Sequence, residues 1–301
     1  MKKYYSISPI FNPNGIGSGF FSNYRICLEK LIHHHENGGV GKPYINWANT
    51  TFVDGFNPIF VNGETTGEFM TMDDTINPFD LWFEQEIPYK LDVPIEDIII
   101  SEIGRPSGVG KWIYHNDHYF NNPTELKRQQ TIDRLYIKPK QYIIDKVDKI
   151  FEEEFKGQVV LAVMARGSEY NKWHGDIYGI STIDKYIEEI GKVLSGNPDI
   201  TKLLIVSDET EYVDKINKAF PESYFVPNIF RRTDETLEYI NEIPYWMNIS
   251  EKRENHCALL GEEVVIQTKL LAKCDYLFGR HCGILAGAVL WNENIKKVFI
   301  I

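Results

Sequence analysis

Two arginines lie at or just after the end of an apolar stretch, where a polar side chain could bind an anion. Residues 159–165 are apolar and are followed by Arg166, while residues 276–278 are followed by Gly279 and Arg280. An arginine presents a planar fork of N–H donors that matches the oxygens of a phosphate or a carboxylate. The sequence leaves two interpretations of Arg166 open: it binds a phosphate of a ligand, or it forms a salt bridge with a neighbouring carboxylate.

A third apolar stretch, residues 203–206, ends in Ser207 and Asp208. Either side chain could cap the helix that follows, and the acid could instead hydrogen-bond a ribose hydroxyl or a base. His281 is equally ambiguous, because a loop histidine either has a structural partner or contacts a ligand. The small-residue stretch 283–290 begins just after it, and the free amides of a helix N-terminus attract phosphate.

A glycine-rich turn that contains Gly17 and Gly19 lies between an expected strand and an expected helix. Its spacing is GxGxG rather than the GxGxxG of dinucleotide-binding folds, and residues 46–49 contain no acid to hold a ribose. These features disfavour a nicotinamide cofactor. The turn is either a plain tight turn or a glycine-lined wall that faces a ligand.

The histidines do not indicate a metal site. Adjacent histidines at 33–35 would point in different directions on a helix, and His115 and His118 lack a third ligand at a usual spacing. We therefore expect neither a bound metal nor a cofactor.

Strands and helices alternate in the second half of the chain, which is typical of a doubly wound parallel sheet. The expected strands are 159–165, 202–207, 223–226, 276–278 and 297–300, and the expected helices are 181–194, 211–219, 261–272 and 283–290. In such a sheet, ligands bind beyond the carboxyl ends of the strands. The polar residues that follow the apolar stretches would all lie at that edge.

The first half follows the same pattern less regularly. Its expected elements are strands at 4–11, 42–47 and 98–101, helices at 20–35 and near 79–85, and helical sequence at 124–155 with a break at Pro139. A charged helix over 140–156 leads directly into the next strand, so we place the domain boundary there. We expect an α/β chain with two Rossmann-like domains, 1–145 and 146–301, that face a central cleft.

Composition is that of a globular protein, with 43% hydrophobic and 25% charged residues among 301. A formal net charge of -11 argues against nucleic acid or an anionic membrane surface as the main partner. The N-terminus does not resemble a signal peptide, no apolar segment is long enough to span a membrane, and the four cysteines have no framework spacing. We expect a cytoplasmic protein, or one recruited peripherally to the inner face of the membrane.

Several motifs, taken in order, resemble those of the fucosyltransferase-like superfamily of GT-B glycosyltransferases. That superfamily includes α1,6-fucosyltransferases, rhizobial nodulation fucosyltransferases, α1,2-fucosyltransferases and protein O-fucosyltransferases. Residues 164–170 are similar to its arginine motif, and residues 204–209 to its strand followed by Ser/Thr-Asp-Asp/Glu. Residues 261–265 and 270–279 resemble its third motif, and the turn at 15–19 resembles its glycine turn.

The resemblance implies an inverting, metal-independent glycosyltransferase of GT-B architecture that uses a nucleoside-diphosphate sugar, with a GDP-sugar such as GDP-fucose favoured. Arg166 would contact the β-phosphate of the donor and help the nucleoside diphosphate to leave. The other donor-binding residues would be Gly17, Gly19, Ser207, Asp208, Glu263, Gly279, Arg280, His281, Cys282 and Gly283.

The acceptor would be a glycan or a lipid-linked glycan, bound by the aromatic and polar residues of the first half. The acceptor-binding candidates are Trp47, Trp112, His115 and Asp117. A carboxylate or a histidine would deprotonate the acceptor hydroxyl. The candidates nearest to Arg166 are Glu169 and His174, and Glu169 could instead only brace the arginine.

Two other functions stay open at this point. One is a carbohydrate-binding protein without catalytic activity on the same fold. In it, the departures from the family pattern would be losses; they are Met164, Gly167, Arg280, His281 and Cys282. The other is a nucleotide-cofactor oxidoreductase, which the missing ribose acid disfavours.

Overall fold

The computed structural model describes residues 4–7, 19–39, 41–47, 58–61, 64–67, 77–85, 98–100, 122–167, 171, 181–233, 239–240, 243–244 and 253–301. The chain divides into two compact units, Met1–Ile143 with Glu251–Glu262, and Ile144–Ser250 with Glu263–Ile301. The division falls within helices α5 (Gln141–Glu154) and α9 (His256–Leu271), so each of these helices has residues in both units. The domain boundary between residues 145 and 146 stays a prediction.

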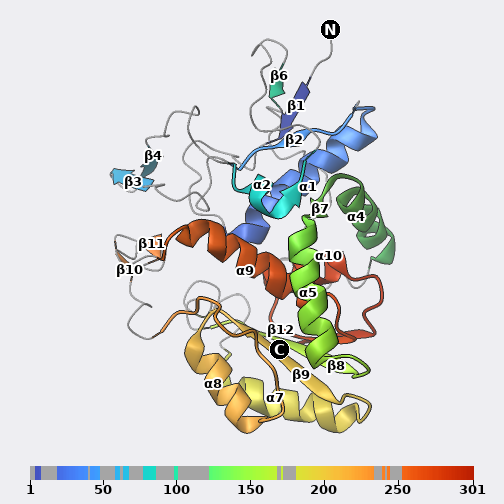
Figure 1. The fold of residues 1–301 in the computed structure, drawn as a ribbon, viewed down its shortest axis with the longest axis vertical. Helices are drawn as coiled ribbons and strands as arrows, with labels where there is room; N and C mark the ends of the chain where they lie inside the picture. Colours follow the sequence, from blue (N-terminus) through green and yellow to red (C-terminus); the bar gives the residue numbers. More distant parts are fainter. Residues whose placement is uncertain are drawn as a thin grey trace. The chain divides into compact units, whose positions relative to one another are not determined.

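A parallel sheet forms the centre of the second unit (Figure 1). Its strands are β8 (Val160–Ala165), β9 (Lys202–Ser207), β12 (Tyr276–Gly279) and β13 (Lys297–Ile300), in the order β13-β12-β8-β9. A parallel bridge between Leu204 and Tyr224 extends the sheet beyond β9. Numbered along the chain, the strands therefore have the spatial order 3-2-1-4-5 of a Rossmann fold.

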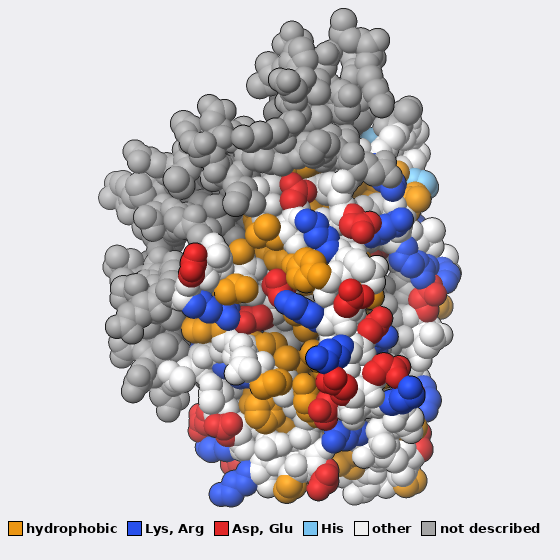
Figure 2. Space-filling view, viewed as in Figure 1, with side chains coloured by type: hydrophobic (Ala, Val, Ile, Leu, Met, Phe, Trp, Pro, Cys, Tyr) orange, Lys and Arg blue, Asp and Glu red, His pale blue; other side chains and the backbone are white. Residues whose placement is uncertain are grey.

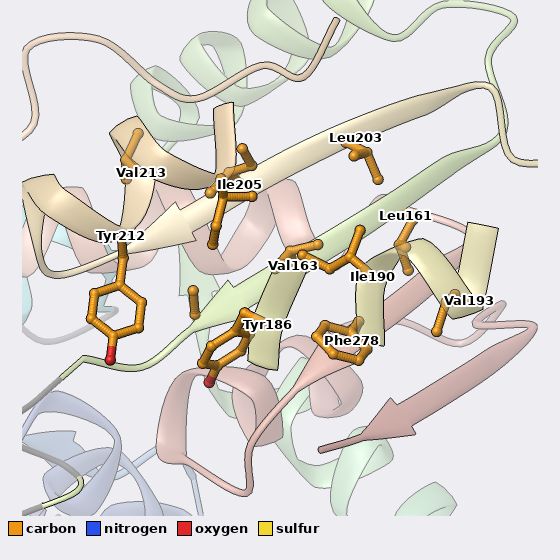
Figure 3. Packing of buried hydrophobic residues seen from close by; sticks show 12 residues of the cluster. Leu161, Val163, Tyr186, Ile190, Val193, Leu203, Ile205, Tyr212, Val213 and Phe278 are labelled. Carbon is orange, nitrogen blue, oxygen red and sulfur yellow. The ribbon is translucent and has the colours of Figure 1, made fainter. Parts of the chain in front are cut away.

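This sheet is covered by helices on both faces. On one face lie α7 (Ile183–Gly196) and α8 (Thr210–Ala219), and Figure 3 shows their apolar side chains meeting those of the strands. In Figure 1, α5, α9 and α10 (Gly283–Trp291) lie on the other side of the sheet. All six residues of β8 are buried, as expected for a continuous apolar run in a parallel sheet.

Helix α7 illustrates how the sequence produces these layers. Its buried residues Tyr186, Ile190 and Val193 recur at the three- and four-residue spacing of one helical face. The helix begins after Thr182, whose side chain accepts a hydrogen bond from the amide of Lys185 at 3.2 Å. The cap fixes where α7 starts, and the apolar face fixes which side meets the sheet.

The first unit contains a parallel sheet with the order β2-β1-β6, formed by β1 (Tyr4–Ile7), β2 (Tyr44–Ile45) and β6 (Ile98–Ile100). Its helices include α1 (Phe20–Glu36), α2 (Phe79–Trp82) and α4 (Pro123–Tyr136). The core of this unit is aromatic, with contacts among the rings of Phe20, Tyr24, Trp47, Phe79, Trp82 and Phe83.

Short antiparallel pairs add to the parallel sheets. They are β3 (Pro58–Val61) with β4 (Glu64–Gly67), β5 (Phe83–Glu84) with β7 (Lys138–Pro139), and β10 (Tyr239–Ile240) with β11 (Ile243–Pro244). Strands of two to four residues are too short for their alternation to be recognised in a sequence.

The α/β class is confirmed, and the strands predicted at 202–207 and 297–300 have the limits of β9 and β13. In the second half of the chain, two elements differ from expectation by more than two residues. The strand predicted at 223–226 is reduced to the single bridge at Tyr224. Helix α9 begins at His256 rather than at Gly261. Gly261 lies inside the helix, and it is a glycine because a side chain there would collide with the ring of Trp82.

Within the described ranges, none of the helices combines the length and the apolar character that a membrane crossing requires. Figure 2 shows acidic and basic side chains mingled over the described part of one face of the molecule. On that face the negative net charge is therefore not gathered into one acidic area.

Candidate functional site

The strand order predicts a ligand-binding position at the carboxyl ends of β8 and β12. These two strands are neighbours, and the helices that follow them, α7 and α10, cover opposite faces of the sheet. Neighbouring strands whose helices diverge in this way leave a crevice at their carboxyl ends, where doubly wound folds bind ligands. The residues that enter this position are Arg166 and Gly167 after β8, and Arg280 to Gly283 after β12.

Gly279 brings the two strand ends together. It pairs in register with Met164, and a Cβ atom at this glycine would lie 2.6 Å from the Met164 carbonyl oxygen. Real Cβ atoms do not approach backbone oxygens so closely, so the residue must be glycine for β12 to keep this position. The structure thus gives Gly279 a steric role, and its predicted contact with the donor stays a prediction.

Arg166 is held at both its backbone and its side chain. Its amide donates a hydrogen bond to the hydroxyl of Tyr186 at 3.1 Å, which ties the strand end to α7. Its guanidinium donates to a carboxylate oxygen of Asp208, the residue that follows β9. The Arg166 side chain is 26% exposed, so solvent or a ligand can reach it. Both interpretations from the sequence persist, because the arginine makes a salt bridge and is still accessible.

Asp208 is shared by two arginines. Arg232 donates from Nη2 to the same Asp208 oxygen, Oδ2, at 2.5 Å and to Glu209 at 3.2 Å. Burial raises the pKa of Asp208, but the guanidinium groups of Arg166 and Arg232 outweigh burial and hold this pKa below its ordinary value. Asp208 is therefore ionised at neutral pH. We call Arg166, Asp208, Arg232 and Glu209 the charged cluster.

Gly167 makes room for this cluster. A Cβ atom at Gly167 would collide with the carboxylate of Glu209, which is almost fully buried beside Arg232. The amide of Glu209 donates to the Ser207 hydroxyl at 3.2 Å. Glu209, and neither Ser207 nor Asp208, is the N-cap residue of α8, so the predicted helix-capping role of those two residues is wrong.

Arg280 is held by a neutral partner. It is completely buried, and its guanidinium donates to Oδ1 of Asn171. The Asn171 side chain also accepts from the amide of Ser181 and donates to the Ser181 carbonyl, each at 3.0 Å. That carbonyl accepts from the Tyr212 hydroxyl at 3.3 Å as well. We call Arg280, Asn171, Ser181 and Tyr212 the amide cluster.

Tyr186 and Tyr212 support both clusters from the helices. In Figure 3 their rings lie near the carboxyl ends of the strands, with both hydroxyls pointing the same way. Tyr186 accepts from Arg166, and Tyr212 donates to Ser181. Burial raises the pKa of both tyrosines, that of Tyr212 to about 12, so both remain neutral.

Cys282 and the start of α10 complete this edge. Cys282 is the N-cap residue of the helix, and it is buried close enough to Arg166 for the two groups to interact electrostatically. Burial raises the pKa of the thiol, which is therefore uncharged. Gly283 opens the helix, and His281 is half-buried in the preceding loop. The first turn of a helix carries amides that favour an anion.

Glu263 lies on α9, where its carboxylate accepts from the amide of Phe230 at 3.4 Å. It also interacts electrostatically with Arg231. The structure therefore places Glu263 beside residues 230 and 231, and it does not show this residue in the charged or the amide cluster.

The predicted role of Trp47 needs correction. This tryptophan is fully buried in the aromatic core of the first unit, where its indole N–H donates to Cys27 and its ring contacts Phe20, Phe79 and Trp82. The ring has no exposed face on which a sugar could stack. Its aromatic character serves the core rather than acceptor binding.

Gly19 is exposed and is the N-cap residue of α1, without a side-chain bond. Several other predicted site residues lie outside the described ranges. They are Gly17, Trp112, His115, Asp117, Glu169 and His174.

Several residues of the two clusters were not predicted from the sequence, among them Arg232 and Asn171. Arg232 follows the Tyr224 bridge, so its position after the third strand of the Rossmann order was a usable signal. Asn171 gave no such signal, because nothing local indicates that an asparagine will meet Arg280, which is 109 residues further along.

Among the described residues, no three His, Cys, Asp or Glu side chains are grouped to hold a metal ion.

No protein-family model and no curated protein matches this chain. Solved structures do resemble it. One is NodZ α-1,6-fucosyltransferase co-crystallised with GDP, with a TM-score of 0.50 and 13% identity over 97% of this chain and 93% of that one. Fucosyltransferase NodZ from Bradyrhizobium has a TM-score of 0.50 and 13% identity over 97% and 94%.

A further similar structure is POFUT1 in complex with GDP-fucose, with a TM-score of 0.50 and 9% identity over 100% of this chain and 98% of that one. These matches extend over nearly the full length of each protein. They confirm the GT-B fucosyltransferase fold that the motifs indicated.

Proposed function

We propose that this chain is a glycosyltransferase that transfers a sugar from a nucleoside-diphosphate donor to a glycan hydroxyl. The observation that carries the proposal is the position of Arg166. It lies at the expected ligand-binding edge between β8 and β12, is partly exposed, and is held by bonds to Tyr186 and Asp208. An accessible arginine that its surroundings orient in advance is suited to bind a diphosphate.

The chemistry follows from where negative charge grows during transfer. As the bond between the anomeric carbon and the diphosphate oxygen breaks, charge accumulates on the departing diphosphate. The guanidinium of Arg166 and the amides at the start of α10 would stabilise this charge. Such preorganised donors can fulfil the role that a metal ion has in other enzymes, so we propose a metal-independent reaction.

GDP-fucose is the donor that we propose first. Structures with the same fold were solved with GDP and with GDP-fucose. We further propose inversion at the anomeric carbon, with a carboxylate or histidine that removes the proton of the acceptor hydroxyl. Glu169 and His174 stay the candidates nearest to Arg166 in the chain.

A thermal-shift screen tests this proposal, with GDP, UDP, dTDP and CMP, each alone and as its sugar. A bound donor raises the apparent stability in proportion to RT ln(1 + [L]/Kd). We expect the best nucleotide sugar also to support transfer to a glycan acceptor, measured as release of the free nucleotide.

The variant Arg166→Ala should slow transfer at least about a hundredfold, the loss typical when one donor to a developing anion is removed. Arg128→Ala is the matched control, because Arg128 lies on α4 of the first unit and bonds to Glu36 and Glu125. Full transfer by Arg166→Ala contradicts the proposed role, and binding of no nucleotide contradicts the function. Binding without transfer to any acceptor would indicate a non-catalytic protein.

A further inference from the structure

Arg166 and Arg232 share one carboxylate oxygen. Both guanidinium groups donate to Oδ2 of Asp208. Their environments differ, because the Arg166 side chain is 26% exposed and the Arg232 side chain only 5%. A ligand can therefore reach Arg166 more readily than Arg232.

Arg232 is also the more firmly fixed of the two. Its amide donates to the Asp208 carbonyl at 2.8 Å, and its carbonyl accepts from the amide of Thr210 at 2.9 Å. Its side chain additionally bonds to Glu209 at 3.2 Å. The backbone of Arg232 is thus tied to residues 208 and 210, and its guanidinium has Glu209 as a second carboxylate partner besides Asp208.

An arginine that leaves a carboxylate to bind a ligand normally leaves a charge uncompensated, and such a charge is costly when it is removed from water. The Asp208 side chain is 25% exposed, so solvent would meet part of this cost, and Arg232, which stays a partner of Asp208, would meet the rest. The low pKa of Asp208 is consistent with this arrangement, since two guanidinium groups keep the acid ionised against the effect of burial.

We propose that Arg232 is a positioning residue that keeps Asp208 neutralised, so that Arg166 can exchange this acid for the diphosphate of a nucleotide. Without Arg232, Asp208 would have Arg166 as its main counter-ion and would retain it. The part that concerns the nucleotide rests on the proposed function. The part that concerns competition for Asp208 does not.

The competition is tested without any ligand, by a double-mutant cycle. The free energy of unfolding in urea is measured for the parent protein, Arg166→Met, Asp208→Asn and the double variant, and the same four proteins are made with Arg232→Met. We expect the coupling between Arg166 and Asp208 to be stronger when Arg232 is absent. An equal or weaker coupling overturns the proposal, whatever the protein binds.

The consequence for binding is tested with GDP and with inorganic pyrophosphate as probes. Arg232→Met should weaken GDP binding about tenfold, which lies within the range of couplings in one charged network. Adding Asp208→Asn should restore most of the affinity, because Arg166 is then released. The control is Arg231→Met, since Arg231 is adjacent in sequence but bonds to the Val226 carbonyl and should leave binding unchanged.

The outcomes separate the two proposals. Parent-like binding by Arg232→Met, or a loss that Asp208→Asn does not relieve, overturns the role of Arg232 while the function stands. If no nucleotide or pyrophosphate binds to the parent protein, the proposed function fails, and the unfolding cycle alone decides on Arg232. Arg232→Lys, which keeps the charge, replaces Arg232→Met if the latter does not fold, and is expected to show a smaller loss.

Discussion

Among the described residues, the arginines at the ends of β8 and β12 have chemically different partners. Arg166 is bound to a carboxylate that it shares with Arg232, and it is partly exposed. Arg280 is bound to the neutral amide of Asn171 and is fully buried. A carboxylate partner can be replaced by another anion, such as a phosphate. The charged cluster is therefore suited to exchange with a ligand, and the amide cluster to fixing the fold at the strand end.

In the amide cluster, both polar atoms of the Asn171 side chain have partners. The Ser181 amide and carbonyl bind the oxygen and the nitrogen of the side chain, respectively, and so determine which way the amide faces. Its oxygen is thereby directed to Arg280. Because Ser181 directly precedes the capped start of α7, this asparagine links the end of β12 to that helix.

The largest effect on stability is expected from Asn171→Ala. The substitution removes bonds to Arg280 and to both backbone groups of Ser181, all of them partly buried, and should lower the free energy of unfolding by about 3 kcal/mol. Urea unfolding measures this loss. In the matched control Asn217→Ala, a single bond to the half-buried Ser223 hydroxyl is lost, and we expect less than about 1 kcal/mol. Equal losses in the two variants would show that the amide cluster does not hold the fold.

A somewhat smaller effect is expected from Gly279→Ala, about 2 kcal/mol in urea unfolding, as for an overpacked core. The new methyl group would meet the Met164 carbonyl, which is backbone and cannot turn away. At Gly167 the obstacle is the Glu209 side chain, which can shift, so Gly167→Ala should cost less. Gly191→Ala in α7 is the control, because it meets no atom within 4 Å and should stabilise the helix. A loss at Gly167 that exceeds the loss at Gly279 would reverse this order.

The smallest effect should appear in the pH dependence of stability. The pKa of Asp208 is below its ordinary value in the folded protein, so its stabilising contribution is present above the pKa of the unfolded chain. That contribution is lost as the pH falls through the lower, folded-state pKa. The difference in unfolding free energy between the parent protein and Asp208→Asn should therefore shrink on acidification.

Asn171→Ala provides the contrast, because the amide does not titrate and its difference from the parent protein should change little over the same pH range. Urea unfolding at several pH values between neutrality and about pH 3 measures both series. A constant difference for Asp208→Asn would contradict the stabilising role of its ionised form.

The secondary structure of the second unit was largely predictable because its signals are local. Continuous apolar runs identified β8 and β9, and helical periodicity identified α7. The bridge at Tyr224 is a counter-example, because the residues around it carried the apolar pattern of a strand but form only one pair with β9. Pairing of that kind depends on the neighbouring strand and not on the segment itself.

The site was predictable only in part. Arg166, Asp208 and Arg280 were recognised because each follows an apolar run, and parallel strands bring their carboxyl ends to one edge. Arg232 and Asn171 were missed, since their significance depends on partners that are distant in the chain. Trp47 was misjudged for the related reason that an aromatic residue can stack on a sugar or fill a core, and burial decides between them.

The sequence by itself therefore determined the alternation of strands and helices, and the identity of the polar residues that leave the sheet. Hydrophobic periodicity and turn chemistry act over a few residues, and one chain displays them without any partner. The tertiary structure alone decided that Asp208 serves two arginines and that an amide holds Arg280. Such contacts depend on strand order and side-chain direction, which arise only when elements distant in the chain pack together.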